Sequence, residues 1–236
     1  MPAPLDLAVI VTLAVLWPAW EHFVMWPRFL ARLGRGATAA RIGAYWQAVA
    51  TQWLLSLAAL AAWVRQGHAW APLRLWSAVP WRVAIGAVIV AGLGWLFAQQ
   101  VALIRRSPKA RAKVRKSLGL AEPFVPRARE EMAPFMVLSL TAGICEEWLF
   151  RGVLTALLAG WLGVWVAVVL ANVVFGLAHS YQGGAGMVKV GIGGLVASGI
   201  VFATGSLVPA MVVHALMDVG AGWSTYLALS AVDPAG

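Results

Sequence analysis

Several ionisable side chains interrupt apolar stretches in the second half of this 236-residue chain, and six of them fall in three short clusters. These six are Glu146, Glu147, Arg151, His179, His214 and Asp218. The chain has only nine acidic residues, so three acids inside apolar stretches stand out. Carboxylates and imidazoles can activate water, stabilise an oxyanion or hold a metal ion. We therefore predict that the six side chains meet in one functional site.

The spacing in the first cluster separates its two glutamates. Glu147 and Arg151 are four residues apart, so they share one face of a helix and can form a buried ion pair. Glu146 lies about 100° further round the helix and does not share that geometry. We therefore predict that Arg151 neutralises Glu147, while Glu146 stays free to act as a general base.

The histidines leave two chemistries open. His214 and Asp218 are also four residues apart, so Asp218 can hydrogen-bond one imidazole nitrogen. Glu146, His179, His214 and Asp218 could together hold a divalent metal such as zinc, or could activate water without one. The absence of a His-Glu-x-x-His zinc motif favours the second chemistry but does not decide between them.

The composition of the whole chain indicates a membrane protein. Hydrophobic residues make up 61% and charged residues 11%, whereas soluble domains have about 45–50% and about 25%. This excludes a soluble enzyme and a disordered protein, and the single residue Cys145 excludes an intrachain disulfide. Unpaired charges at the centre of a membrane helix cost about 2.5–3.5 kcal/mol each, so the ionisable side chains should face one another inside a helix bundle.

Seven apolar runs are long enough to cross a membrane as helices, because about 20 helical residues span the hydrocarbon core. They cover residues 5–26, 42–64, 83–104, 132–158, 161–178, 187–204 and 207–229. The predicted fold is an all-α polytopic membrane bundle of about seven transmembrane helices. We divide it into N-terminal spans with a basic loop (1–131, loop 105–131), a core that carries the site (132–229) and a C-terminal tail (230–236).

The basic residues predict the orientation. The net charge is +9, and 13 of 18 basic residues fall within segments 28–41 and 105–129. The positive-inside rule makes these segments cytoplasmic, with the N-terminus outside and the C-terminus inside. We expect an integral protein of the bacterial inner membrane, in contact with membrane lipid. Because topology explains the positive charge, we predict no nucleic-acid partner.

Three local signals give further predictions. Pro18 should kink the first apolar run. Ser107 is a suitable N-cap for a short basic helix over residues 109–116 that would lie on an anionic lipid surface. Gly183 and Gly184 predict a turn before the sixth run.

Three short motifs resemble those of the CPBP (CAAX protease and bacteriocin-processing) intramembrane proteases, which include Rce1-like prenyl endopeptidases. The motifs are Glu146-Glu147-x-x-x-Arg151, Phe175-x-x-x-His179 and His214-x-x-x-Asp218, in that order along residues 132–229. The resemblance implies an all-helical membrane peptidase with its site inside the bundle, open toward the cytoplasmic side. The family has been described both as metalloproteases and as glutamate-type proteases.

The resemblance also implies roles for these residues. Glu146 would be the general base and would activate water together with His179. His214 and Asp218 would bind the oxyanion or orient that site, Glu147 and Arg151 would hold the scaffold, and Phe175 would line the substrate cavity.

The predicted function is hydrolysis of a peptide bond in a membrane-associated protein or peptide. Prenyl endopeptidases carry asparagine where this chain has Asp218, and an ionised aspartate cannot donate to an oxyanion. Whether the substrate is prenylated therefore stays open. Two other functions remain: a non-catalytic immunity or partner-binding protein of the same fold, and a proton-coupled transporter.

Overall fold

The protein is an all-helical membrane bundle. The structure is a computed structural model that describes residues 3–230, so most of the predicted tail over 230–236 lies outside the described residues. The chain is 89% helical, and no strand occurs in the described part. These features confirm the predicted fold class.

The helices follow one another with short connections. The first half contains α1 (Pro4–Val11), η1 (Thr12–Leu16), α2 (Trp17–Trp20), η2 (Glu21–Met25), α3 (Trp26–Leu33), α4 (Ala37–Arg65), η3 (Ala71–Leu73), α5 (Pro80–Arg106) and α6 (Pro108–Ser117). The second half contains η4 (Gly119–Phe124), α7 (Arg129–Glu146), η5 (Glu147–Leu154), α8 (Thr155–Leu162), α9 (Val164–Ala178), η6 (Ser180–Gln182), α10 (Gly183–Thr204) and α11 (Leu207–Ser230). The elements η1, η2 and η5 are π-helical, and η3, η4 and η6 are 3₁₀-helical.

Six continuous helices are long and apolar enough to cross a membrane. They are Pro4–Leu33, Ala37–Arg65, Pro80–Arg106, Arg129–Leu162, Ser180–Thr204 and Leu207–Ser230. The predicted run over 161–178 becomes the shorter helix α9, whose 15 residues extend about 22 Å at 1.5 Å per residue. This length falls short of the hydrocarbon core of about 30 Å. The C-terminal end of α9, where His179 follows, therefore lies within the bundle.

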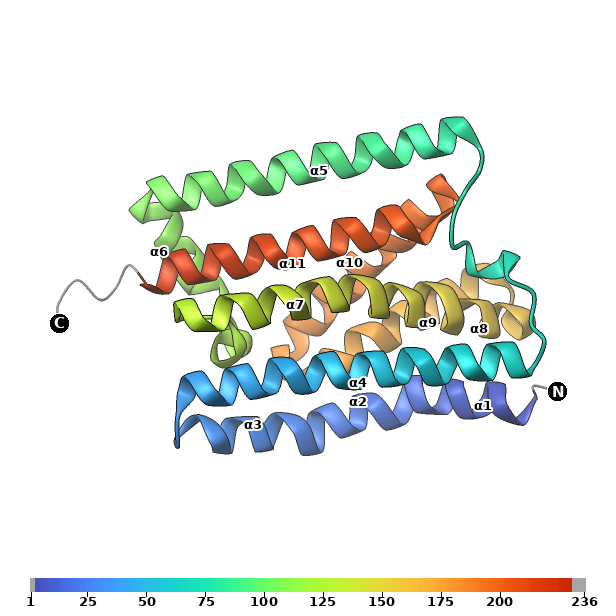
Figure 1. The fold of residues 1–236 in the computed structure, drawn as a ribbon, viewed down its shortest axis with the longest axis horizontal. Coiled ribbons are helices and arrows are strands. Elements are labelled where there is room, and N and C mark those ends of the chain that lie inside the picture. Colours follow the sequence, from blue (N-terminus) through green and yellow to red (C-terminus); the bar gives the residue numbers. More distant parts are fainter. Residues whose placement is uncertain (1–2, 231–236) are drawn as a thin grey trace.

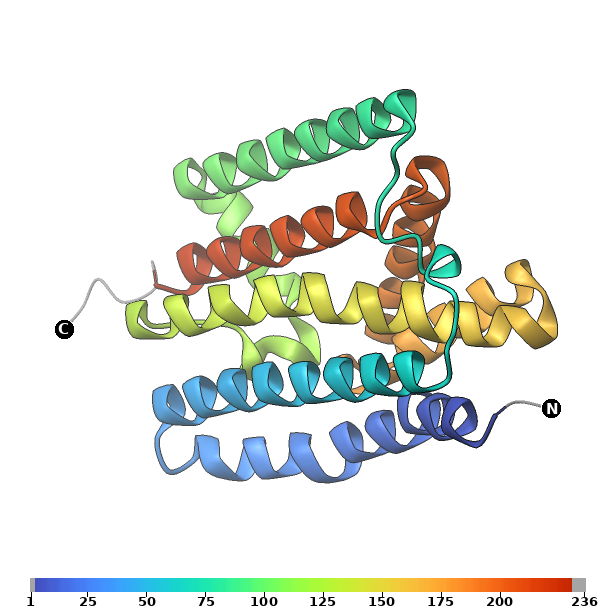
Figure 2. The ribbon, with the colours of Figure 1, turned by 45° about the vertical axis from the view of Figure 1, so that its right-hand side comes forward.

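The continuous helix α7–η5–α8 occupies the centre of the bundle. It lies between α4 and α11 in both views (Figure 1, Figure 2), and it packs against each of them. The helix α5 packs on the other side of α11, and α10 packs against α9. Glu146, Glu147 and Arg151, in the middle of this continuous helix, are consequently buried in protein.

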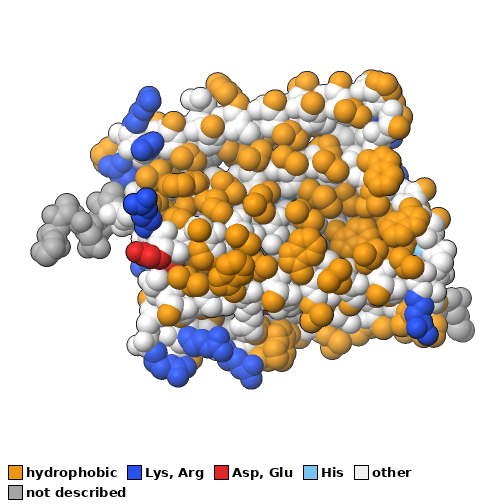
Figure 3. Space-filling view, in the orientation of Figure 1, with side chains coloured by type: hydrophobic (Ala, Val, Ile, Leu, Met, Phe, Trp, Pro, Cys, Tyr) orange, Lys and Arg blue, Asp and Glu red, His pale blue; other side chains and the backbone are white. Residues whose placement is uncertain are grey.

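Charge is segregated along the bundle. Apolar side chains cover the visible side, whereas Lys and Arg gather at the ends, mainly at the end where the C-terminus lies (Figure 3). The connection between α3 and α4 and the short helix α6 both lie at that end (Figure 1). The two basic segments are thus on one side, as the predicted orientation requires. That this side faces the cytoplasm stays a prediction.

The local signals have clear structural outcomes. The helix Pro4–Leu33 is continuous through Pro18, and the π-helical turns η1 and η2 end just before Trp17-Pro18 and Trp26-Pro27; the predicted kink at Pro18 stays a prediction. A π-helical turn is wider than an α-helical turn, so it can accommodate the proline that follows it, which lacks a backbone N–H and crowds the preceding turn. Ser107 caps α6 by accepting a hydrogen bond from the Ala110 N–H at 3.2 Å. Gly183, at φ 77°, makes the turn between η6 and α10.

Gly143 sets the distance between the two helices that carry most of the ionisable cluster. A Cβ atom at this position would lie 2.7 Å from the Met211 carbonyl oxygen and 2.8 Å from the Ala215 Cβ, both on α11. We expect Gly143→Ala to lower the free energy of unfolding by about 1–3 kcal/mol, because α7 and α11 must separate. Unfolding of the detergent-purified protein by SDS measures this change. The control is Gly92→Ala on α5, where an added Cβ meets nothing within 4 Å.

Candidate active site

All the predicted site residues lie in one connected cluster inside the bundle. Helix α7 and the π-helical turn η5 supply the two glutamates and the arginine, α9 supplies Phe175, and α11 supplies His214 and Asp218. His179 is the residue at which α9 ends. The structure therefore brings together side chains that are up to 72 residues apart in sequence, from Glu146 to Asp218.

Glu146 has one bound and one unbound carboxylate oxygen. Its Oε1 accepts a hydrogen bond of 2.8 Å from Gln52 Nε2 on α4. Its Oε2 is buried and has no hydrogen-bond partner among residues 3–230. This oxygen lies 3.9 Å from His179 Nε2 and 3.8 Å from His214 Nε2. These distances are too long for direct hydrogen bonds, but they allow one water molecule to contact all three atoms.

The backbone fixes the tautomer of His179. Its Nδ1 lies 2.9 Å from the carbonyl oxygen of Phe175, which can only accept, so Nδ1 carries the hydrogen. In the neutral ring, Nε2 is then a hydrogen-bond acceptor facing Glu146. The buried C-terminal turn of α9 thus supplies the contact that orients this ring.

His214 is held by Glu147, a partner that the spacing did not predict. Its Nδ1 lies 2.8 Å from Glu147 Oε1, so the ring donates to this carboxylate. The expected partner, Asp218, lies on the other side of the ring, with Oδ2 3.6 Å from His214 Nε2. This distance permits charge attraction but exceeds that of a hydrogen bond. The reason for the difference is the close packing of α7 and α11, which brings Glu147 to the ring from another helix.

Arg151 makes the predicted pair with Glu147. Its Nη1 lies 3.2 Å from Glu147 Oε1, and both side chains are almost completely buried. Its Nη2 donates to Asn172 Oδ1 at 3.1 Å, and Asn172 in turn donates to Ser198 on α10. The guanidinium also lies 4.0 Å from the ring centre of Phe175. One arginine thus links η5 to α9 directly and to α10 through Asn172.

The π-helical turn η5 changes how the motif presents its side chains. It runs over Glu147–Leu154, directly after Glu146. At its end, the hydroxyl group of Thr155 donates a hydrogen bond to the backbone carbonyl of Phe150, five residues earlier. π-Helical turns within α-helices are rare, and they often occur at functional sites. Because the turn is wider than an α-helix, Glu147 and Arg151 do not sit at regular α-helical angles.

Three polar residues of the cluster were missed from the sequence. Gln52, Asn172 and Ser198 are buried, and each hydrogen-bonds within the cluster. None of the three side chains is ionisable, so the scarcity of charge in the apolar runs does not point to them. Two amides within long apolar runs were the available signal, since buried amides in membranes need partners.

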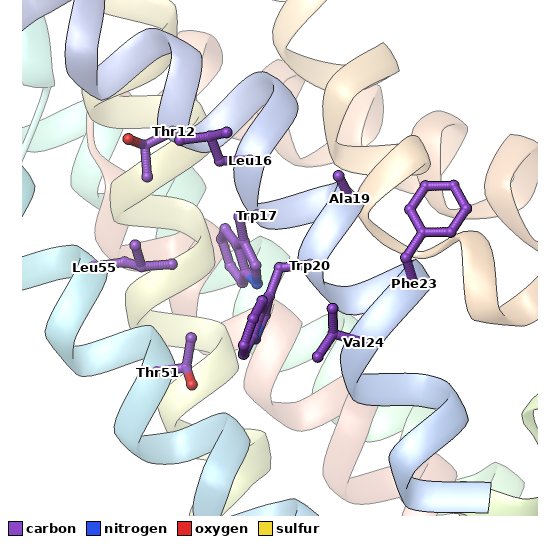
Figure 4. A pocket seen from close by; sticks show the side chains of 9 residues that line it. All are labelled: Thr12, Leu16, Trp17, Ala19, Trp20, Phe23, Val24, Thr51 and Leu55. Atoms are coloured by element: carbon purple, nitrogen blue, oxygen red, sulfur yellow. The ribbon is translucent and has the colours of Figure 1, made fainter.

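An apolar groove lies beside the site on the outer surface of the bundle. It has a volume of about 540 Å³ and is lined by Thr12, Leu16, Trp17, Ala19, Trp20, Phe23, Val24, Thr51 and Leu55. Figure 4 shows the rings of Trp17 and Trp20 between the N-terminal helix and α4, which carries Thr51 and Leu55. Gln52, which follows Thr51 in α4, bonds to Glu146, so one helix borders both the groove and the site.

The carboxylates and imidazoles of the cluster are side chains of the kind that bind metal ions. Among residues 3–230, no group of three or more His, Cys, Asp and Glu side chains has the arrangement of a metal site. Glu147 Oε1 and the Phe175 carbonyl accept hydrogen bonds from Nδ1 of the two histidines, as partners of metal-binding histidines also do. Glu146 Oε2, which lies 3.9 and 3.8 Å from the Nε2 atoms of His179 and His214, and these two nitrogens are the atoms that could hold a metal ion. The function proposed below uses the side chains alone, and its test includes the metal-dependent alternative.

Gln52 gives a direct test of the geometry around Glu146. Gln52→Leu removes the only hydrogen bond that Glu146 makes in the described structure. The loss of a hydrogen bond to a charged group costs about 1.5–3 kcal/mol, and each 1.36 kcal/mol of barrier is tenfold in rate. We expect kcat of any hydrolysis to fall about 10- to 100-fold. Gln47→Leu, one and a half turns away on the same helix, should leave kcat unchanged.

Residues 128–220 match the family model described as type II CAAX prenyl endopeptidase Rce1-like. The resemblance that the three motifs predicted is thereby confirmed for this part of the chain, which contains every predicted site residue. At the family level, the match supports a CAAX-type intramembrane protease. Comparisons with curated proteins and with solved structures gave no match.

Proposed function

We propose that this chain, whose residues 128–220 match the Rce1-like family, is an intramembrane endopeptidase that uses Glu146 to activate water. One observation carries this proposal. Glu146 Oε2 is buried without a hydrogen-bond partner and faces the Nε2 atoms of two histidines at 3.8 and 3.9 Å. A water molecule between these three atoms would satisfy them all.

The first step is attack by water on the peptide carbonyl. Glu146 Oε2 accepts a proton from the water, while the lone pair of His179 Nε2 accepts a hydrogen bond from its second hydrogen. The oxygen of the water forms a bond to the carbonyl carbon, and the carbonyl oxygen becomes an oxyanion. Glu146 then transfers its proton to the nitrogen of the leaving amine, and the C–N bond breaks.

His214 is the proposed oxyanion donor. Its Nδ1 donates to Glu147, so a protonated ring carries a second N–H at Nε2. Carboxylates of Glu146, Glu147 and Asp218 lie within 3.8 Å of the ring and stabilise its positive charge. In this role Asp218 does not donate to the oxyanion. Instead, its carboxylate lies 3.6 Å from His214 Nε2 and attracts the protonated ring, which is the donor.

Glu147 and Arg151 are positioning residues in this proposal. Glu147 orients the His214 ring through a hydrogen bond of 2.8 Å, and Arg151 balances the charge of Glu147. Asn172 fixes the other edge of the guanidinium. Through these contacts, the positions of η5 and α9 determine the orientation of the His214 ring on α11.

The substrate would be a membrane-associated protein or peptide that carries an apolar group. The groove beside α4 could receive that group, because Trp17 and Trp20 line it and Gln52 connects the same helix to Glu146. A prenyl chain is one candidate for the apolar group. We expect this activity in the bacterial inner membrane, with the basic end of the bundle in the cytoplasm.

Cleavage of a defined peptide tests the function. The purified protein is placed in liposomes with a quenched fluorescent peptide that ends in a farnesylated cysteine motif, and with the same peptide lacking farnesyl. We expect the wild-type protein to cleave the farnesylated peptide faster and His179→Ala to be inactive. His22→Ala, a histidine that contacts Ser180 but not Glu146, is the matched control.

Three outcomes distinguish the alternatives. Cleavage that survives His179→Ala contradicts the proposed water activation. Cleavage that is lost in EDTA and restored by zinc contradicts the metal-free mechanism. If neither peptide is cleaved but one binds with equal affinity to wild type and Glu146→Gln, the non-catalytic partner-binding function is favoured.

A further inference from the structure

A second cavity lies at the opposite end of the bundle from the basic segments. It has a volume of about 270 Å³ and lies among η3 and its following residues, η5, α8, α9 and α10. Its lining residues include Arg74, Arg151, Thr155, Ser198 and Phe202. No acidic side chain lines this cavity. Two guanidinium groups therefore face one small space without a carboxylate in its wall.

Arg151 reaches this cavity with unused donors. The side chain is only 3% exposed, and within residues 3–230 its Nε and Nη1 have no hydrogen-bond partner. Glu147 lies 3.2 Å from Nη1 and balances the charge of the guanidinium, but it leaves these N–H groups without a hydrogen bond. A buried guanidinium with a free N–H is costly unless a polar group approaches it.

Arg74 is held at the cavity by an unusual backbone. At φ 51° it is the only residue other than glycine with positive φ among residues 3–230. Such conformations cost energy and persist where the surroundings impose them. Here the Arg74 carbonyl accepts a hydrogen bond of 2.7 Å from the Leu207 N–H. Its guanidinium lies 4.5 Å from the ring centre of Phe202, which lines the same cavity.

The Ser198 hydroxyl in the cavity wall also favours a ligand that accepts hydrogen bonds. The hydroxyl of Ser198 accepts a hydrogen bond from Asn172, so its own hydrogen is available to donate. Thr155 uses its hydrogen on the Phe150 carbonyl. Guanidinium groups bind oxyanions through paired N–H groups, and the volume exceeds that of one phosphate group.

We infer that this cavity binds a phosphate-type oxyanion between Arg74 and Arg151. The anion comes either from the headgroup of a phospholipid or from free phosphate. Ala156, Val164 and Val201 in the wall suit the glycerol and first acyl carbons of a phospholipid. Because Arg151 also pairs with Glu147, a bound anion would compete for the same positive charge, which connects this cavity to the orientation of His214.

The test is thermal unfolding of the full chain in dodecyl maltoside. Potassium phosphate is added against potassium chloride at equal ionic strength, and phosphatidylglycerol against a diacylglycerol with the same acyl chains and no phosphate, in mixed micelles. A ligand at about ten times its Kd should raise Tm by about 3–6 °C. We expect this rise to disappear in Arg74→Asn, since asparagine tolerates the left-handed conformation and lacks the charge. Arg65→Asn, an exposed arginine at the same end, should keep it.

A second variant covers the case in which Arg74→Asn does not fold. An added Cβ at Gly160 meets nothing within 4 Å, so Gly160→Asp places a carboxylate at the cavity without a clash. It should raise Tm without ligand and remove the response to phosphate. A response to inorganic phosphate supports a free ion, and a response only to phosphatidylglycerol supports a lipid headgroup. An equal Tm rise in wild type, Arg74→Asn and Gly160→Asp, or no rise with either ligand, overturns the inference.

Discussion

Glu146→Gln is expected to lower kcat of peptide hydrolysis about 10²- to 10⁴-fold, the range that a positioned general base contributes. Glutamine keeps a carbonyl oxygen that can accept the hydrogen bond from Gln52 Nε2, so the helix contact at 2.8 Å can be retained. It loses the proton-accepting oxygen that faces His179 and His214. The variant therefore separates the chemical role of Glu146 from its structural role.

The measurement is the initial rate of cleavage of the farnesylated peptide in liposomes, with SDS unfolding of the same preparation. Glu130→Gln is the matched control, since Glu130 is an exposed acid in the first turn of the same helix. KM should stay within about twofold, because Glu146 acts mainly on the transition state. A variant that keeps the wild-type rate would falsify the assignment of Glu146 as base.

The sequence was sufficient to predict the membrane fold and the membership of the cluster. Apolar length and the scarcity of charge identify the helices, because a lipid environment leaves few alternatives for the backbone. The pairing of Glu147 with Arg151 also followed from local spacing and is present at 3.2 Å. These features depend on residues within one helix or on the cost of charge in lipid.

The contacts between helices could not be predicted in this way. The hydrogen bond from His214 to Glu147, rather than to Asp218, depends on how closely α7 and α11 pack at Gly143. Gln52 reaches Glu146 from the part of the chain that lies outside the Rce1-like match. The π-helical turn η5 and the length of α9 likewise follow from tertiary packing rather than from the apolar pattern. Each of these depends on the relative rotation and depth of separate helices.

Removal of Arg151 should have the largest effect on stability. Arg151→Met leaves Glu147 buried at 1% side-chain exposure, without its cationic partner at 3.2 Å. Breaking a buried pair from one side costs about 3–5 kcal/mol, because an uncompensated charge remains. We expect the free energy of unfolding in SDS to fall by that amount. Arg106→Met, which replaces an exposed arginine at the end of α5, should change it by less than about 0.5 kcal/mol.

A double-mutant cycle assigns this loss to the pair rather than to packing of the long side chain. Glu147→Gln removes the negative charge and keeps an oxygen that can accept from His214 Nδ1. In the double variant with Arg151→Met neither charge remains, so the total loss should be smaller than the sum of the single losses by about 0.5–3 kcal/mol. Strict additivity would mean that Arg151 stabilises the bundle through Asn172 and Phe175 instead. The same two variants separate stability from catalysis: a double variant that regains its fold but not its cleavage rate shows that the charges of the pair, beyond the hydrogen bond that glutamine can keep, are needed at His214.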